Sequence, residues 1–175
     1  ENEDGTVSFA LNTPTVPNGK TPIILSFAEA NYYSDTNYGA YSDKMVLADD
    51  GSVQNEYIDE AGNVQIGAYD VVPVVDAFVE EHPDFSLRGA RGIISLTGYE
   101  GVFGHDLSTD AEEIKGIADS LKENGWLIAC NGYSNAMMES EMDTNALQED
   151  LDNWQEQVAS LVGDTDLLFY PFGDS

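Results

Sequence analysis

Aromatic and polar side chains follow three short apolar runs of this sequence. Glu29 comes after the first run, Asn131 and Asn135 come after a later one, and Phe172 follows the last. Tyrosines lie in or near these and neighbouring loop segments: Tyr32, Tyr33, Tyr38, Tyr41, Tyr99 and Tyr133. Aromatic faces beside neutral polar groups suit sugar rings, but tyrosine is equally common as a structural residue of loops. A carbohydrate-binding surface and ordinary loop packing are both open at this point.

The two histidines and the single cysteine do not form a metal or nucleophile motif. His82 precedes a proline and is expected to end a helix. His105, with Asp106 beside it, is a better candidate for chemistry, but one histidine does not make a metal site. Cys130 is the only cysteine, which excludes an internal disulfide framework and a cysteine-rich zinc module. Because it closes an apolar run, we expect it to be buried.

Four apolar runs predict the strands that would position these residues, at 22–27, 92–97, 126–130 and 167–170. The run at 22–27 has the pattern of a strand buried on both faces of a parallel sheet. Three helices are predicted between them. Their signals are a cap at Asp70, a capping box over 109–112 and an apolar stripe over 147–161. Strands that alternate with helices indicate an α/β fold with a parallel sheet, whose functional residues lie at the carboxyl ends of its strands.

Two further segments lie outside this alternation. Residues 1–21 are polar and broken by prolines, so they predict an N-terminal arm. Residues 43–68 combine short β-prone runs with Asp/Gly turns and predict a β-hairpin insertion. A calcium loop is disfavoured there, because the EF-hand template would place Val46 and Tyr57 at ligand positions.

The composition excludes several classes of partner. The chain has 175 residues, with 33 acidic against 6 basic side chains and a formal net charge of −27. A field of this sign repels nucleic-acid backbones and anionic lipid surfaces. An apolar content of 42% is too high for a disordered acidic tail, so one folded domain is expected. No apolar run reaches membrane-spanning length, and we expect no membrane insertion.

The strand-end residues resemble the motifs of the polysaccharide deacetylases, the NodB-homology domains of carbohydrate esterase family 4. The family's motifs are Thr-Phe-Asp-Asp-Gly, then His-(Ser/Thr)-x-x-His, then Arg-x-Pro-aromatic. The first motif resembles residues 26–30, the second 131–135 and the third 169–172. The resemblance covers roughly residues 22–173. It implies a domain at 22–175 that is similar to part of an irregular (β/α)-barrel and incomplete at its C-terminus.

The resemblance also implies roles for individual residues. Members of the family use a divalent metal, usually zinc, to hydrolyse N- or O-acetyl groups of polysaccharides. The catalytic base position is Ala28 here, and the metal-ligand positions are Glu29, Asn131 and Asn135. The backbone N–H of Phe172 stands where the family stabilises an oxyanion. Substrate-binding candidates are Tyr32, Tyr133 and Tyr170.

The substitutions at these positions predict impaired catalysis. Ala28 cannot accept a proton, whereas the reaction needs a base to activate the attacking water. One carboxylate and two amide oxygens form a hard, weak ligand set that suits calcium or magnesium better than zinc, so we expect no metal or a weakly bound one. Two alternatives to an impaired deacetylase are open. One is a carbohydrate-binding pseudoenzyme, and the other is an inert structural or engineered scaffold in which these residues are only a polar lining.

Partners and location follow from the same expectations. The predicted partner is a polysaccharide, acetylated or partly deacetylated, since free amines would be attracted by the negative charge. Four strands cannot close the family's barrel, so an open sheet edge is expected, with possible pairing to a second copy. The chain begins without methionine, as a chain would after removal of a secretion signal or after trimming at a chosen boundary, and both are open. The resemblance leads us to expect a secreted or cell-envelope protein.

Overall fold

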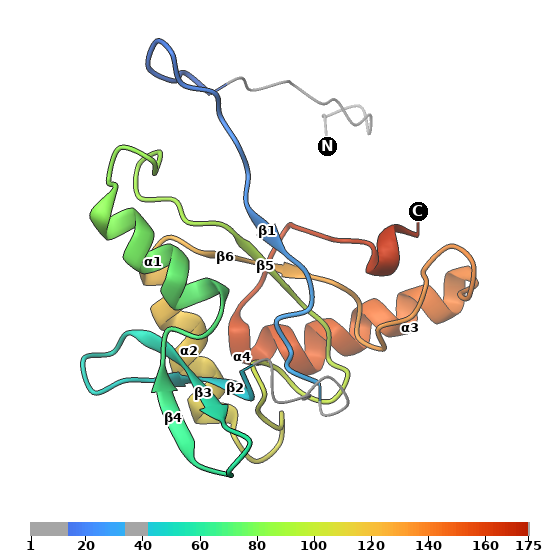
Figure 1. Ribbon diagram of the computed structural model, residues 1–175. Coiled ribbons are helices and arrows are strands. Elements are labelled where there is room, and N and C mark those ends of the chain that lie inside the picture. Colours follow the sequence, from blue (N-terminus) through green and yellow to red (C-terminus); the bar gives the residue numbers. More distant parts are fainter. Residues whose placement is uncertain (1–13, 34–41, 175) are drawn as a thin grey trace.

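A computed structural model describes residues 14–33 and 42–174 of the chain, which form a mixed α/β structure with two separate sheets (Figure 1). The first sheet is parallel and has the order β1-β5-β6. Its strands are β1 (Ser26–Phe27), β5 (Ile93–Leu96) and β6 (Leu127–Cys130). Chain order and spatial order therefore agree, as expected for strands joined by helical crossovers.

The first predicted strand is much shorter than its apolar run. Only Ser26 and Phe27 pair with β5, and the side chains of Ile23 and Ile24 are 62% and 81% exposed. The prediction that the whole run is buried on both faces is therefore wrong. β1 is an edge strand, so it has a strand partner on one side only.

The last predicted strand is reduced to a single parallel bridge between Leu168 and Cys130. The N–H of Cys130 donates to the Leu167 carbonyl at 2.9 Å, and the N–H of Phe169 donates to the Cys130 carbonyl at 2.8 Å. The segment thus continues the order of the parallel sheet beyond β6.

The second sheet is antiparallel and confirms the hairpin prediction. Its strands are β2 (Lys44–Leu47), β3 (Val53–Ile58) and β4 (Val64–Gly67), in the order β2-β3-β4. The turns use the expected chemistry, because Asp50 accepts a hydrogen bond from the Ser52 N–H and Asp59 accepts from the Asn63 N–H.

Four helices follow: α1 (Val71–Glu81), α2 (Ala111–Glu123), α3 (Thr144–Trp154) and α4 (Ser160–Val162). A π-helical stretch, Gln155–Ala159, joins the last two. Asp70 caps α1 as predicted, and His82 closes it with an N–H bond to the Phe78 carbonyl. The capping box before α2 is not formed. Asp110 occupies the cap position, since Asp106 accepts the N–H groups of Ser108 and Thr109 in a competing turn.

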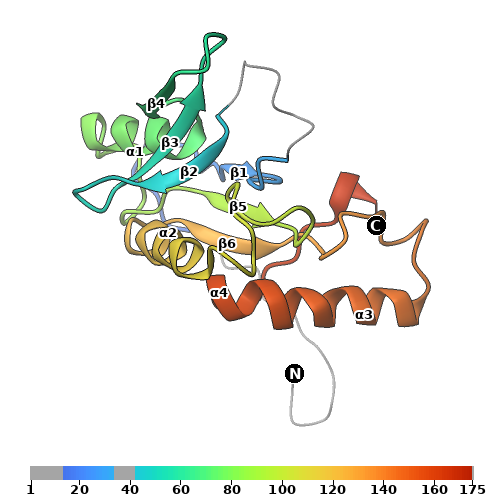
Figure 2. The same cartoon turned by 90° about the horizontal axis from the view of Figure 1, so that it is seen from below.

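One core joins the elements. Phe27, Ile94 and Ile128 stand side by side on the parallel sheet and pack against apolar residues of α2, α3 and α4. α2 also contacts β2 and β3, which brings the antiparallel sheet into the same core. Figure 2 shows the antiparallel sheet and α1 at the β1 end of the parallel sheet, and α3 and α4 at the β6 end. No helix in the described parts of the chain is long and apolar enough to cross a membrane.

Candidate functional site at the carboxyl edge of the parallel sheet

A buried asparagine joins the loops that follow β1 and β5. The Asn31 side chain is fully buried and donates from Nδ2 to the carbonyls of Thr97, at 2.9 Å, and Gly101, at 2.6 Å. Its Oδ1 accepts the Thr97 N–H at 3.2 Å. These bonds fix the first loop against the second, although 66 residues separate Asn31 from Thr97. The sequence analysis gave no role to Asn31, since nothing local marks a residue whose partners lie so far along the chain.

A buried carboxylate holds the loop that follows β6. Asp150 of α3 is 6% exposed and accepts the N–H groups of Tyr133 and Ser134 at 2.7 and 2.8 Å and the Ser134 hydroxyl at 2.6 Å. Gly132 has φ +74°, and a Cβ there would lie 2.9 Å from Asp150 Oδ2. The sequence analysis also missed Asp150. Its only local signal is an acidic residue directly before Leu151, which lies in the apolar stripe of the helix.

The turn that follows the last bridge lies beside the same loop. Pro171 is buried, and its Cγ would lie 3.8 Å from a Cβ at Gly132. Phe172 has φ +58°, in the left-handed region, and its side chain is 62% exposed. The turn at 171–173 therefore adjoins the loop that follows β6 at the carboxyl edge of the sheet.

Left-handed backbone conformations are concentrated at this edge. Among the described residues other than glycine, Arg88 is the one with positive φ away from this edge. The others lie in the strand-end loops: Glu29, Tyr32, Glu100, Phe103, Asn135 and Phe172. Each such conformation costs about 1–2 kcal/mol for a residue with a Cβ. Strain of this kind persists where the surrounding structure fixes a functional shape, so the edge is the best candidate site of the described chain.

The predicted ligand residues lie in two loops of this edge. Glu29 is partly exposed after β1, and its N–H donates to the Ser95 hydroxyl of β5 at 3.4 Å. Ala28, beside it, is exposed. Asn131 and Asn135 lie in the loop after β6, which we call the asparagine loop, and Asn131 is only 2% exposed. Because β5 lies between β1 and β6, the backbone of Glu29 contacts β5 and not the asparagine loop.

Two buried polar atoms of the asparagine loop have no hydrogen-bond partner. They are Nδ2 of Asn131 and Oδ1 of Asn135. A buried polar group without a partner costs about 1–3 kcal/mol, and such groups are rare in folded proteins. The amides at these two positions are therefore poorly matched to their surroundings.

The residues present do not fit zinc. The unpaired atom of Asn131 is an amide nitrogen, which donates hydrogens and offers no lone pair to a metal. In the described ranges, no group of three or more His, Cys, Asp or Glu side chains could hold a metal ion. Of the three predicted ligand positions, Glu29 carries a carboxylate, whereas Asn131 and Asn135 carry amides.

Most tyrosine hydroxyls near the edge already have protein partners. Tyr133 donates to Gln157 at 2.9 Å, and the Tyr33 hydroxyl lies 2.8 Å from that of Thr97. The Tyr32 hydroxyl accepts from Asn55 Nδ2 at 3.1 Å. Tyr170 is 49% exposed and is the predicted substrate-binding residue with the most accessible ring. Tyr38 and Tyr41 lie outside the described residues.

The histidines have structural surroundings. His82 stacks on Phe78 with ring centroids 4.6 Å apart, beyond the last turn of α1. His105 is 7% exposed, and its Nε2 lies 2.7 Å from the Met45 carbonyl of β2. His82 is exposed and ends α1, as expected, whereas the buried ring of His105 joins its loop to β2.

Cys130 is buried, as predicted, and should react slowly. Burial raises the pKa of its thiol from 9.0 to about 11, which lowers the thiolate fraction at pH 8 about 100-fold. We expect iodoacetamide to alkylate the native protein at least that much more slowly than the urea-unfolded chain. Because folding raises this pKa, the contribution to stability is complete below pH 9 and is lost as the pH rises toward 11. Equal native and unfolded rates, followed by mass spectrometry, would contradict the burial of the thiol.

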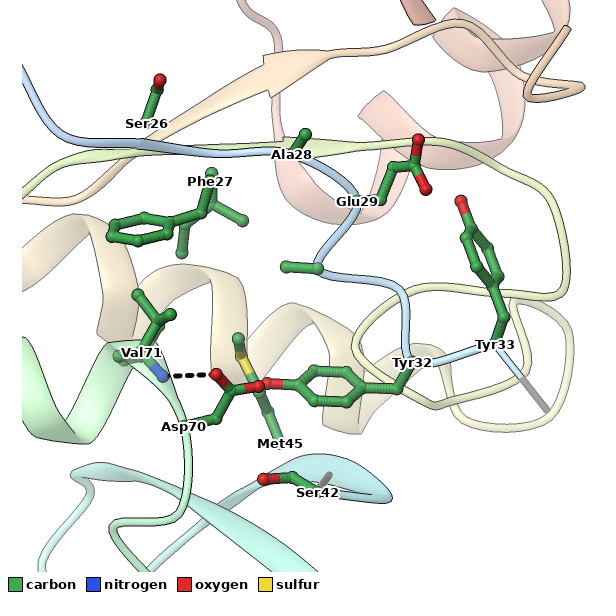
Figure 3. Close-up of a pocket in the computed structure, with 13 residues that line it drawn as sticks. Ser26, Phe27, Ala28, Glu29, Tyr32, Tyr33, Ser42, Met45, Asp70 and Val71 are labelled. Carbon is green, nitrogen blue, oxygen red and sulfur yellow. Dashed lines mark hydrogen bonds between the residues drawn. The ribbon is translucent and has the colours of Figure 1, made fainter. Parts of the chain in front are cut away.

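A separate cavity of about 630 Å³ adjoins the edge strand β1 (Figure 3). Its walls include Phe27 and Glu29 from the first strand and loop, Ser42 and Met45 from the region of β2, and Asp70 at the start of α1. We call it the β1 cavity. Its volume is within the range of small-molecule sites.

No protein-family model matches the chain, and no curated protein or solved structure gives a significant match.

Proposed function

We propose that this chain is a polysaccharide deacetylase-like domain that binds carbohydrate at the carboxyl edge of its parallel sheet and is catalytically impaired. The supporting observation is the pair of buried, unpaired polar atoms on Asn131 and Asn135. These are the two positions at which the resembled motif has histidine. An imidazole pair with a metal would satisfy both positions, whereas the amides leave them unmatched.

The arrangement of the motifs supports the same proposal. The loops after β1 and β6 and the turn at 171–173 all follow strands of one parallel sheet or the bridge beyond β6. We propose that this order corresponds to the first part of the family's irregular (β/α)-barrel. The uncovered edges of the sheet are then candidates for pairing with a second copy, and a secreted or cell-envelope location fits a polysaccharide partner.

The proposed impairment has a direct chemical cause. Ala28 supplies no base for the attacking water, and Glu29 with two amides supplies no zinc-binding set. We expect no acetate release from acetylated chitooligosaccharides or acetylxylan with added zinc, cobalt or nickel, measured by an enzyme-coupled acetate assay. Metal-dependent turnover that a chelator abolishes would overturn this part of the proposal.

Binding can be tested through the exposed aromatic ring at the edge. We expect the protein to be retained on insoluble acetylated or partly deacetylated polysaccharide. Tyr170→Ala should weaken this binding about fivefold, which corresponds to the loss of about 1 kcal/mol from one aromatic contact. Tyr69→Ala is the matched control, because Tyr69 is 46% exposed but lies between β4 and α1. Equal binding by the two variants would place any carbohydrate site elsewhere.

The inert scaffold is the second candidate, and one observation favours it. The hydroxyls of Tyr32, Tyr33 and Tyr133 already bond to protein groups. A scaffold predicts no retention on any of the polysaccharides, so the same assay separates the two functions.

A further inference from the structure

We propose that the β1 cavity binds a protonated amine, and that the natural ligand class is the amino sugar of a partly deacetylated polysaccharide. The amine specificity is argued from the cavity alone, whereas the assignment to a polysaccharide rests on the function proposed above. The cavity is distinct from the asparagine loop, since Asn131 and Asn135 do not line it.

Two carboxylates give the cavity its charge. Asp70 and Glu29 both line it, and neither forms an ion pair within the described part of the chain. In Figure 3 the Asp70 carboxylate projects into the space between Val71 and Tyr32, and Glu29 lies at the end of the cavity near Tyr33. A negatively charged cavity with no internal cation favours a cationic ligand.

The positive end of α1 does not cancel the charge that the Asp70 carboxylate offers a ligand. Asp70 Oδ1 accepts the Val71 N–H at 2.7 Å. The positive end of a helix is equivalent to roughly half a charge, so one full carboxylate charge outweighs it. The pKa of the adjacent Tyr32 hydroxyl is held well above its ordinary value by burial and then by Asp70, so this phenol stays neutral.

A buried hydroxyl independently points to a ligand. Ser42 is 5% exposed, lines the cavity, and its Oγ has no hydrogen-bond partner. In Figure 3 the Ser42 side chain lies below Asp70 and Met45. An ammonium group has three N–H donors, which the Asp70 carboxylate and the Ser42 oxygen on the same side of the cavity can accept.

The remaining walls suit a sugar ring. Phe27, Met45 and Val71 form an apolar side, and the rings of Tyr32 and Tyr33 add aromatic surface. A cation is attracted to aromatic faces as well as to carboxylates. An amino sugar, which carries an ammonium group on a ring with apolar faces, matches both parts of the cavity.

The test compares glucosamine, N-acetylglucosamine and glucose by isothermal titration calorimetry at pH 6 and 150 mM salt. At this pH the amine is charged, and the salt screens the charges of the open surface. We expect glucosamine to bind about tenfold more tightly than the other two, the value of one charge-assisted hydrogen bond. Equal affinity for the three sugars, or no detectable binding of glucosamine, would overturn the proposal.

Two variants make the same change, from aspartate to asparagine, at the N-terminal caps of two different helices. Asp70→Asn removes the charge but keeps an oxygen for the Val71 N–H, so α1 stays capped. Asp143→Asn makes the same change at the cap of α3, where the side chain accepts the N–H groups of Asn145 and Ala146. We expect the amine preference to be lost in Asp70→Asn and retained in Asp143→Asn. Ser42→Ala should weaken glucosamine binding several-fold, and a preference that survives both cavity variants contradicts the site.

The outcomes separate this inference from the proposed function. Retention on polysaccharide without an amine preference would remove the inference and leave the carbohydrate-binding function. Glucosamine binding that depends on Asp70, without retention on any polysaccharide, would keep the amine site and remove the polysaccharide assignment.

Discussion

Zinc affinity is expected to rise about 100-fold when Ala28→Asp, Asn131→His and Asn135→His are combined in one chain. Each new imidazole adds a ligand that zinc prefers, and about tenfold for each of two ligands corresponds to about 2.8 kcal/mol. The histidines also replace the two amides whose buried atoms have no partner. Calorimetric titration of zinc into the parent and the triple variant measures the gain.

Two control variants test whether the added zinc affinity comes from the predicted ligand positions. Adding Glu29→Gln to the triple variant removes the carboxylate at the predicted ligand position and should reverse most of the gain. Asn131→His alone should gain no more than about tenfold, because it supplies one of the two imidazoles. If the triple variant is folded and binds zinc no better than the parent, the alignment with the deacetylase motifs is wrong.

Removing the buried carboxylate of α3 is expected to cause the largest loss of stability. Asp150→Ala leaves the N–H groups of Tyr133 and Ser134 without their acceptor, and a buried unpaired donor costs about 1–3 kcal/mol. We expect the free energy of unfolding, measured by urea denaturation, to fall by about 3 kcal/mol. The loop also loses its anchor, so Cys130 should react faster with iodoacetamide.

The matched control lies two residues further along the same helix. Asp152 is exposed and accepts a hydrogen bond from Gln148. Asp152→Ala should change the free energy of unfolding by no more than about 0.5 kcal/mol, as is usual at the surface. If both variants lost the same small amount, the hydrogen bonds to Asp150 would not be what holds the loop after β6.

Local signals in the sequence were sufficient for the parts of the fold that depend on local interactions. Asp70 and His82 delimit α1 as predicted, because a cap bonds to residues within one turn. The hairpin turns were predicted for the same reason. The capping box at 109–112 failed through another local interaction, since the Asp106 carboxylate competes for the Ser108 and Thr109 N–H groups.

Distant interactions explain the parts that were not predicted. The apolar run at 22–27 reads as a buried strand, but burial of Ile23 and Ile24 depends on what covers them, which the run itself does not encode. The residues predicted as a site, Glu29, Asn131 and Asn135, follow β1 and β6, and their role stays a prediction. The anchors of these loops, Asn31 and Asp150, were missed because their partners lie elsewhere in the chain.

The backbone and side chain of Asn31 make two loops one cooperative unit. The side chain of Asn31 accepts the Thr97 N–H and so protects this amide from hydrogen exchange. The backbone carbonyl of Asn31 accepts the Gly104 N–H at 2.8 Å. Opening of either loop therefore breaks the bonds of both, so their amides should share a single exchange free energy. A destabilising substitution in the segment after β1 would then lower the exchange free energy of the Gly104 amide as much as that of the substituted residue.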